Sequence, residues 1–214
     1  MSTQFLALIP ARYGSTRFPG KPLAKIQGKP MIQHVYEKSS AIFSHTFVAT
    51  DDQRIATVVN EFGGKYIMTS DKHQSGTDRC AEALETAEKE TGLEFDVVVN
   101  IQGDEPFIAS EQLQLITSCF DDTQTHIATL VKQIDKQTDL FDTNKPKVVI
   151  GVNGRAIYFS RTPIPYLRNF EESHWLQKHR FYKHIGLYAY RSHVLREITQ
   201  LPQSPLELAE SLEQ

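Results

Sequence analysis

Residues 95–106 read FDVVVNIQGDEP, a strongly apolar run followed directly by an acidic turn. A short continuous apolar run bounded by turn residues is typical of a strand that is buried on both faces. We therefore predict a central strand over residues 95–101. The turn 102–106 then places carboxylates at the carboxyl end of this strand, and ligands of open α/β sheets bind beyond that edge.

Strand and helix patterns alternate on both sides of this stretch. The expected strands are residues 5–9, 46–50 and 65–69, and the expected helices are a segment from Met31 and residues 52–62, 77–90 and 110–120. Such alternation predicts a largely parallel sheet covered by helices. After about residue 125 the pattern becomes rich in strands, some of them antiparallel, at residues 127–131, 147–152, 156–159 and 185–191. Residues 171–183 carry no clear pattern.

Length and composition bound the class of protein. The 214 residues suggest one domain with a sizeable core. No apolar stretch approaches the roughly 20 residues that span a bilayer, and no signal peptide is recognised at the N-terminus. Cys80 and Cys119 form neither a disulfide framework nor a zinc spacing. We expect a soluble, cytoplasmic protein without a membrane partner.

The net charge of −3 hides an asymmetry. Five cations and no acid precede Glu37, whereas the remaining 178 residues carry 18 basic and 26 acidic side chains, a net charge of −8. The total charge argues against a nucleic-acid-binding protein, and the distribution predicts an anionic ligand near the N-terminal end.

The N-terminal cations gather in a segment that reads PARYGSTRFPGKPL, residues 10–23, which we call the basic loop. It leaves the first strand and offers the guanidiniums of Arg12 and Arg17, the ammonium of Lys21, and backbone N–H groups at Gly and Ser positions. A triphosphate would satisfy this combination. The loop is not a Walker A motif, because five residues separate Gly14 from Gly20 and a proline follows Lys21. The alternative is a solvated loop with scattered basic residues.

The acidic turn offers hard oxygen ligands at the same predicted edge. Mg²⁺ usually takes one or two carboxylates together with substrate phosphates. The alternative is an ordinary polar turn that ends at Pro106. Because a cationic loop is predicted at the same edge, we favour a metal-binding role for this turn.

The chain resembles the CMP-Kdo synthetases, the 3-deoxy-manno-octulosonate (Kdo) cytidylyltransferases. The resemblance rests on ordered motifs along the whole chain: residues 9–35 (IPARYGSTRFPGKPLAKIQGKPMIQHV), 48–52 (VATDD), 73–79 (HQSGTDR), 100–106 (NIQGDEP), 158–161 (YFSR), 183–191 (KHIGLYAYR) and 204–214 (SPLELAESLEQ).

This resemblance implies a fold and a division of labour. The fold is α/β, a Rossmann-like three-layer nucleotidyltransferase with a mostly parallel mixed sheet and a later strand-rich embellishment, in a single domain over residues 1–214. About residues 1–125 would bind CTP, and about residues 126–214 would bind the sugar acid and form a homodimer.

The resemblance also implies a Mg²⁺-dependent reaction, in which the anomeric hydroxyl of Kdo attacks the α-phosphate of CTP and releases pyrophosphate, for lipopolysaccharide biosynthesis. The implied catalytic residues are Arg12, Lys21 and the metal ligand Asp104. The implied nucleotide-binding residues are Pro10, Ala11, Arg12, Ser15, Arg17, Lys21, Ser75, Gly76 and Arg79. The implied sugar-acid residues are Gln102, Arg161, His184, Tyr188, Glu213 and Gln214.

Elementary chemistry is compatible with these roles. Nucleotidyl transfer needs mostly positioning and charge stabilisation. The guanidinium of Arg161 suits the carboxylate of a sugar acid, and the alternative is an ordinary surface arginine. His184 and Tyr188 lie on one face of a predicted strand, where they could line a pocket, and the alternative is packing in the core.

Two alternatives concern the acceptor and the chain end. The acceptor could be another sugar acid, 8-amino-Kdo or a sialic acid. Family members carry a second magnesium aspartate in a later motif, and this chain stops in a helical pattern that includes Leu206, Leu208, Ala209 and Leu212. We therefore expect a shortened chain, with an inactive nucleotide-binding form as a further possibility.

Overall fold

The computed structural model describes residues 3–14, 18–73 and 75–212, and they group into two compact units. Unit 1 comprises Met1–Ala128 and Gly186–Leu201, and unit 2 comprises Thr129–Ile185 and Pro202–Gln214. From the sequence we expected one division near residue 125, with all later residues in the second part. Gly186–Leu201 belongs to unit 1 because its first residues pair with the strand over Val97–Asn100 and the helix that follows packs on the same unit.

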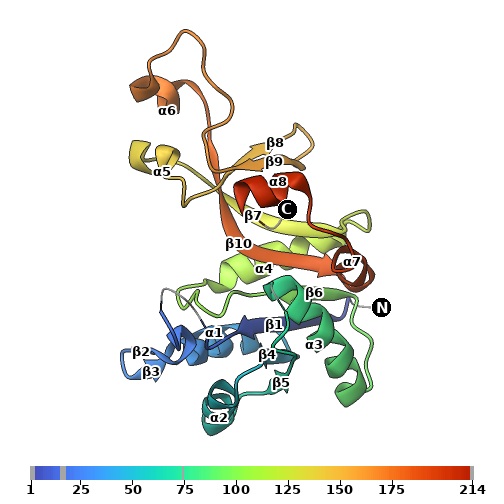
Figure 1. The fold of residues 1–214 in the computed structure, drawn as a ribbon. Helices are drawn as coiled ribbons and strands as arrows, with labels where there is room; N and C mark the ends of the chain where they lie inside the picture. Colours follow the sequence, from blue (N-terminus) through green and yellow to red (C-terminus); the bar gives the residue numbers. More distant parts are fainter. Residues whose placement is uncertain (1–2, 15–17, 74, 213–214) are drawn as a thin grey trace. The chain divides into compact units, whose positions relative to one another are not determined.

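Unit 1 is built on a mostly parallel sheet (Figure 1). Its strand order is β5 (Tyr66–Met68), β4 (Thr46–Thr50), β1 (Phe5–Ala11), β6 (Val97–Asn100) and β10 (Tyr182–Arg191). The first four strands are parallel, and β10 runs antiparallel to β6. The predicted central position of residues 95–101 is confirmed, since β6 lies between β1 and β10.

Helices cover both faces of this sheet. Successive strand residues point to opposite faces, so Leu6 and Leu8 pack with Leu84 of α3 (Gly76–Thr91), which also contacts α7 (Ser192–Ile198). On the other face, α1 (Met31–Ser40) contacts β1, β4 and α4 (Ser110–Ser118), and its Tyr36 packs on Phe62 at the end of α2 (Gln53–Glu61). The predicted three-layer α/β architecture is therefore confirmed. Shorter elements of unit 1 are η1 (Lys21–Leu23), β2 (Lys25–Ile26), β3 (Lys29–Pro30) and η2 (Cys119–Asp121).

Unit 2 contains most of the predicted strand-rich part of the chain. Strand β8 (Lys147–Ile150) pairs antiparallel with β9 (Ala156–Ser160) and with the first residues of β10, and β7 (Ile127–Gln133) also pairs with β10. A small core joins Ile134, Leu140, Trp175 and Phe181. The helices are α5 (Gln137–Phe141), η3 (Glu172–His174), α6 (Trp175–Lys178) and α8 (Pro205–Glu210). Residues 171–183, which carried no clear pattern, contain η3, α6 and the start of β10.

Strand β1 runs two residues further than predicted, through Pro10 to Ala11. Proline is tolerated there because the pairing of β1 with β6 stops at Leu8, while only β4 continues alongside.

The helical pattern at the C-terminal end was also predicted too long. Helix α8 ends at Glu210, and Ser211 adopts the left-handed conformation with φ of 49° as its C-cap. A left-handed residue commonly ends a helix, and here serine fills a position that usually holds glycine or asparagine. Among the residues described, no helix is both long and apolar enough to cross a membrane.

Candidate active site

The basic loop and the acidic turn meet beyond the carboxyl ends of β1 and β6. The Nζ atom of Lys21 lies 2.5 Å from Oδ2 of Asp104, and the two side chains are 38% and 46% exposed. Arg12 follows β1 and is exposed. The predicted convergence of cation and carboxylate at one sheet edge is thus confirmed for Lys21 and Asp104. Ser15 and Arg17 lie outside the described residues.

A glycine lets the acidic turn approach the end of β1. A Cβ atom on Gly103 would lie 2.8 Å from the carbonyl oxygen of Pro10, closer than real Cβ contacts. The backbone that carries Asp104 therefore lies against Pro10 and Ala11. The position of this carboxylate depends on the absence of a side chain at residue 103.

The start of α3 reaches the same place. A Cβ atom on Gly76 would lie 3.4 Å from Cγ of Pro10, and Ser75 caps the helix by accepting a hydrogen bond from the Asp78 N–H at 3.0 Å. The structure thus brings together Pro10, Ala11, Ser75 and Gly76, which were predicted to bind the nucleotide. Whether they contact it stays a prediction.

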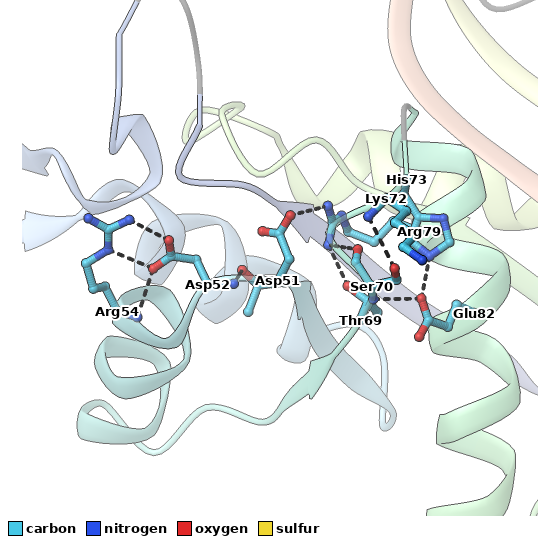
Figure 2. Close-up of polar contacts among 10 residues, drawn as sticks. Asp51, Asp52, Arg54, Thr69, Ser70, Lys72, His73, Arg79 and Glu82 are labelled. Atoms are coloured by element: carbon cyan, nitrogen blue, oxygen red, sulfur yellow. Dashed lines mark hydrogen bonds and ion pairs between the residues drawn. The ribbon is translucent and has the colours of Figure 1, made fainter.

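Arg79 is buried beneath this turn, and Figure 2 shows its partners. Its guanidinium lies 2.8 Å from Oδ2 of Asp51 and donates a 2.5 Å hydrogen bond to Oγ1 of Thr69. These contacts tie α3 to the residues that follow β4 and β5. The geometry gives Arg79 a role in holding the site together, and its predicted contact with the nucleotide stays a prediction.

A second polar pair organises the segment before α3. Glu82 accepts hydrogen bonds from His73 and from the N–H of Ser70, the latter at 2.9 Å (Figure 2). Burial by itself would raise the pKa of Glu82, but the Ser70 N–H and His73 bring this pKa below its usual value. The turn over residues 70–73 is therefore anchored to α3.

The acidic turn carries two carboxylates, those of Asp104 and Glu105. Burial raises the pKa of Glu105, and the charge of Asp104 raises it further. Within the described part of the chain, no group of three or more His, Cys, Asp or Glu residues could hold a metal ion.

Two predicted sugar-acid residues lie in unit 1. Tyr188 of β10 is paired directly with Asn100 of β6. Gln102 follows β6, and a Cβ atom on Gly186 would lie 3.9 Å from its Cγ atom. Gln102 and Tyr188 thus belong to one pair of neighbouring strands.

Arg161 of unit 2 is engaged by carbonyl oxygens. Its Nε atom donates to Glu210 at 2.5 Å, and its terminal nitrogens donate to Thr143 and Ser211, each at 2.9 Å. Two of these carbonyls belong to the end of α8, where a cation is favoured. Arg161 therefore holds α8 in the structure, and its predicted contact with a sugar carboxylate stays a prediction.

Glu210 is a structural residue that the sequence analysis missed. Its carboxylate accepts hydrogen bonds from the Arg161 N–H, the Ser160 hydroxyl and the Tyr158 hydroxyl at 3.0, 3.0 and 3.1 Å. The Arg161 N–H is the main reason that the pKa of Glu210 is lowered. Local sequence held no signal for this anchor, because its partners lie about 50 residues away. Glu213 and Gln214 lie outside the described residues.

His184 of unit 2 is held as a neutral side chain. Burial lowers its pKa to about 4, and its Nε2 atom lies 2.8 Å from Oγ1 of Thr129. A neutral imidazole can accept as well as donate a hydrogen bond. This suits a polar contact with a sugar, and that contact stays a prediction.

Comparison with known proteins supplies the family. A model of a family described as cytidylyltransferase matches residues 6–214. A 3-deoxy-manno-octulosonate cytidylyltransferase of Parabacteroides distasonis is 59% identical over 215 residues, which cover 99% of this chain and 84% of that protein. The chain belongs to the 3-deoxy-manno-octulosonate cytidylyltransferase family. The resemblance inferred from the motifs is confirmed.

Further relatives of this cytidylyltransferase agree. The enzyme of the same name from Escherichia coli is 47% identical over 210 residues, with 97% of this chain and 80% of that protein covered. A solved CMP:2-keto-3-deoxy-manno-octonic acid synthetase in complex with CTP matches with a TM-score of 0.88 and 44% identity, over 98% of this chain and 83% of that one. A solved cytidylyltransferase of Leptospira borgpetersenii, 16% identical with a TM-score of 0.59, shares the fold.

Proposed function

We propose that the protein transfers CMP from CTP to the anomeric hydroxyl of Kdo and releases pyrophosphate. The observation that carries this proposal is the meeting of Lys21 and Asp104 beyond β1 and β6, in a chain that is 44% identical to a synthetase solved with CTP. The high identity to enzymes named for Kdo favours this acceptor over 8-amino-Kdo or a sialic acid.

In this proposal the chain acts mainly through charge and position. Lys21 and the exposed Arg12 would balance the charge of the triphosphate, and the pyrophosphate that leaves would remain beside them. Pro10 and Gly76, which lie close together, would form part of the wall for the nucleoside. No covalent intermediate with a side chain is required, because the attacking hydroxyl belongs to the sugar acid.

We further propose that the reaction depends on Mg²⁺, with Asp104 as a ligand. A single exposed carboxylate suits an ion that also binds substrate phosphates, as Mg²⁺ commonly does. When bound, the ion would supply positive charge at the α-phosphate. Lys21, which now pairs with Asp104, would then be released towards the triphosphate.

The proposed function is tested by pyrophosphate release. Purified protein is mixed with CTP and Mg²⁺ and, in separate reactions, with Kdo, 8-amino-Kdo or a sialic acid. We expect the highest kcat/KM with Kdo. A higher kcat/KM with another acid would identify that acid, and not Kdo, as the acceptor. No turnover with any of the acids would contradict the proposal.

The metal role is tested with Asp104→Ala, and Glu94→Ala is the matched control. Both carboxylates are exposed, but Glu94 precedes β6 and Asp104 follows its carboxyl end. We expect turnover to fall by at least about 100-fold for Asp104→Ala, with stability within about 0.5 kcal/mol of wild type. Glu94→Ala should behave as wild type. Unchanged turnover of Asp104→Ala would remove it as a ligand.

The remaining expectations are part of the same proposal. Activated Kdo would serve lipopolysaccharide biosynthesis, the enzyme would act in the cytoplasm, and two copies would form a homodimer. Gel filtration with light scattering measures the last of these directly.

A further inference from the structure

Tyr13 joins the two ends of the basic loop. Its carbonyl oxygen accepts a hydrogen bond from the Gly20 N–H at 2.9 Å. Its ring lies so close to Gly20 that a Cβ atom there would be 2.9 Å from Cε2, and Gly20 has a positive φ of 70°. Arg12 and Lys21 are the chain neighbours of Tyr13 and Gly20. The contact between Tyr13 and Gly20 therefore sets how these two cations are spaced.

Arg54 of α2 holds the ring of Tyr13. The guanidinium carbon lies 3.3 Å from the ring centroid, within the range of a cation–π contact. A planar guanidinium can stack on an aromatic face, whereas a lysine ammonium is a point charge. Arg54 thereby links Tyr13 of the basic loop to α2, a helix that packs on β4 and β5.

The orientation of Arg54 is set by Asp52. Nε and a terminal nitrogen of Arg54 donate to the two oxygens of Asp52 at 2.9 and 2.6 Å, as Figure 2 shows. The same carboxylate caps α2 by accepting the Arg54 N–H at 2.9 Å. Since the Arg54 side chain is 60% exposed, this ion pair contributes little stability. Its effect is to fix the direction of the guanidinium.

We propose that Tyr13 and Arg54 are positioning residues that hold the backbone of Arg12 and Lys21 in place for CTP, an inference that rests on the proposed role of these two cations in triphosphate binding. Backbone that is already fixed at these two positions loses less conformational freedom when the ligand binds. Loss of the stacked pair therefore weakens CTP binding, while turnover at saturating CTP changes less.

The first test compares Tyr13→Phe, which keeps the ring, with Tyr13→Leu, which removes it. The dissociation constant of CTP is measured by calorimetry without sugar acid, and kcat and both KM values are measured with Kdo. We expect Tyr13→Leu to bind CTP about 5- to 30-fold more weakly. Tyr13→Phe should stay within about 2-fold of wild type, and the KM for Kdo should not change. CTP binding by Tyr13→Leu as tight as that of wild type would overturn the inference.

The second test separates stacking from charge. Arg54→Lys keeps the positive charge but loses the planar face and the paired contact with Asp52, and Arg54→Met loses all three. We expect both variants to bind CTP more weakly, by similar factors. A CTP affinity of Arg54→Lys equal to that of wild type would show that positive charge suffices and would contradict the stacking role. Lys65→Met, a cation of unit 1 that lies 5.8 Å from the ring of Phe47, is the control and should bind CTP as wild type does.

Two readouts keep the inference separate from the proposed function. Circular dichroism and the unfolding midpoint show whether each variant is folded. If Tyr13→Leu is not folded, the Arg54 variants carry the test, and CTP binding by Arg54→Met as tight as that of wild type would overturn the inference. If wild type binds CTP but transfers CMP to no acid, the proposed function fails, and the CTP affinities of the variants still test the positioning role.

Discussion

Arg79→Met is the perturbation whose effect on stability follows most directly from the structure. Arg79 is buried and its ion pair with Asp51 measures 2.8 Å, with a second bond of 2.5 Å to Thr69. Methionine keeps an unbranched apolar stem but leaves the partly buried Asp51 carboxylate without its cation. Removing one partner of a buried pair costs about 3–5 kcal/mol.

The same chain contains an exposed pair for comparison. Arg54 and Asp52 are 2.6 Å apart, but the arginine side chain is 60% exposed, against 4% for that of Arg79. Exposed ion pairs contribute at most about 1 kcal/mol. Arg54→Met should therefore destabilise the protein far less than Arg79→Met does, although each variant removes an Arg–Asp pair.

The assay is urea unfolding followed by circular dichroism, together with the thermal midpoint. For a chain of this length each kcal/mol shifts the midpoint by about 2–4 °C, so we expect Arg79→Met to unfold roughly 10 °C lower. Adding Asp51→Leu to Arg79→Met should recover part of the loss, because no unpaired charge then remains. A loss below about 1 kcal/mol for Arg79→Met would refute the reasoning from burial.

Two further predictions test other parts of the molecule. Asp139 is buried between Lys145 and Lys183, each at 2.7 Å, and these hydrogen bonds lower its pKa to about 2 from 3.8. Its contribution to stability is therefore present above about pH 4 and is lost as the pH falls towards 2. The thermal unfolding midpoints of wild type and Asp139→Asn should differ at pH 7 and converge between about pH 4 and pH 2. A difference in midpoint that stays constant with pH would contradict this. Gly103→Ala should destabilise the protein by about 1–3 kcal/mol and lower turnover. The added methyl group would lie 2.8 Å from the Pro10 carbonyl oxygen and would displace Asp104. An unchanged unfolding midpoint and unchanged activity would contradict this, since they would show that the turn can move to make room.

Much of the fold could be predicted from the sequence. Apolar runs and helical periods located the parallel strands and their helices, because each pattern reflects a local choice of buried face. The strand over residues 95–101 was placed correctly at the centre of the sheet. The errors lay at ends: β1 continues through Pro10, and α8 ends at Glu210, since both boundaries depend on partners from elsewhere in the chain.

The candidate site was predictable at the sheet edge. Parallel strands present their carboxyl ends on one side, so a loop after β1 and a turn after β6 must approach each other, and Lys21 and Asp104 do. The motifs also named Pro10 and Gly76, which lie close together. The contacts expected with CTP, Mg²⁺ and the sugar acid stay predictions.

The sequence by itself determined the α/β class, the family and the charges that gather at the N-terminal end, because these depend on composition, spacing and motifs. Only the tertiary structure decided where side chains turn. Arg79 points to Asp51, Arg161 binds the end of α8, and Arg54 stacks on Tyr13. A guanidinium bonds with whichever acceptors folding brings near it, and residues 28 to 50 positions apart become neighbours only when the chain is packed.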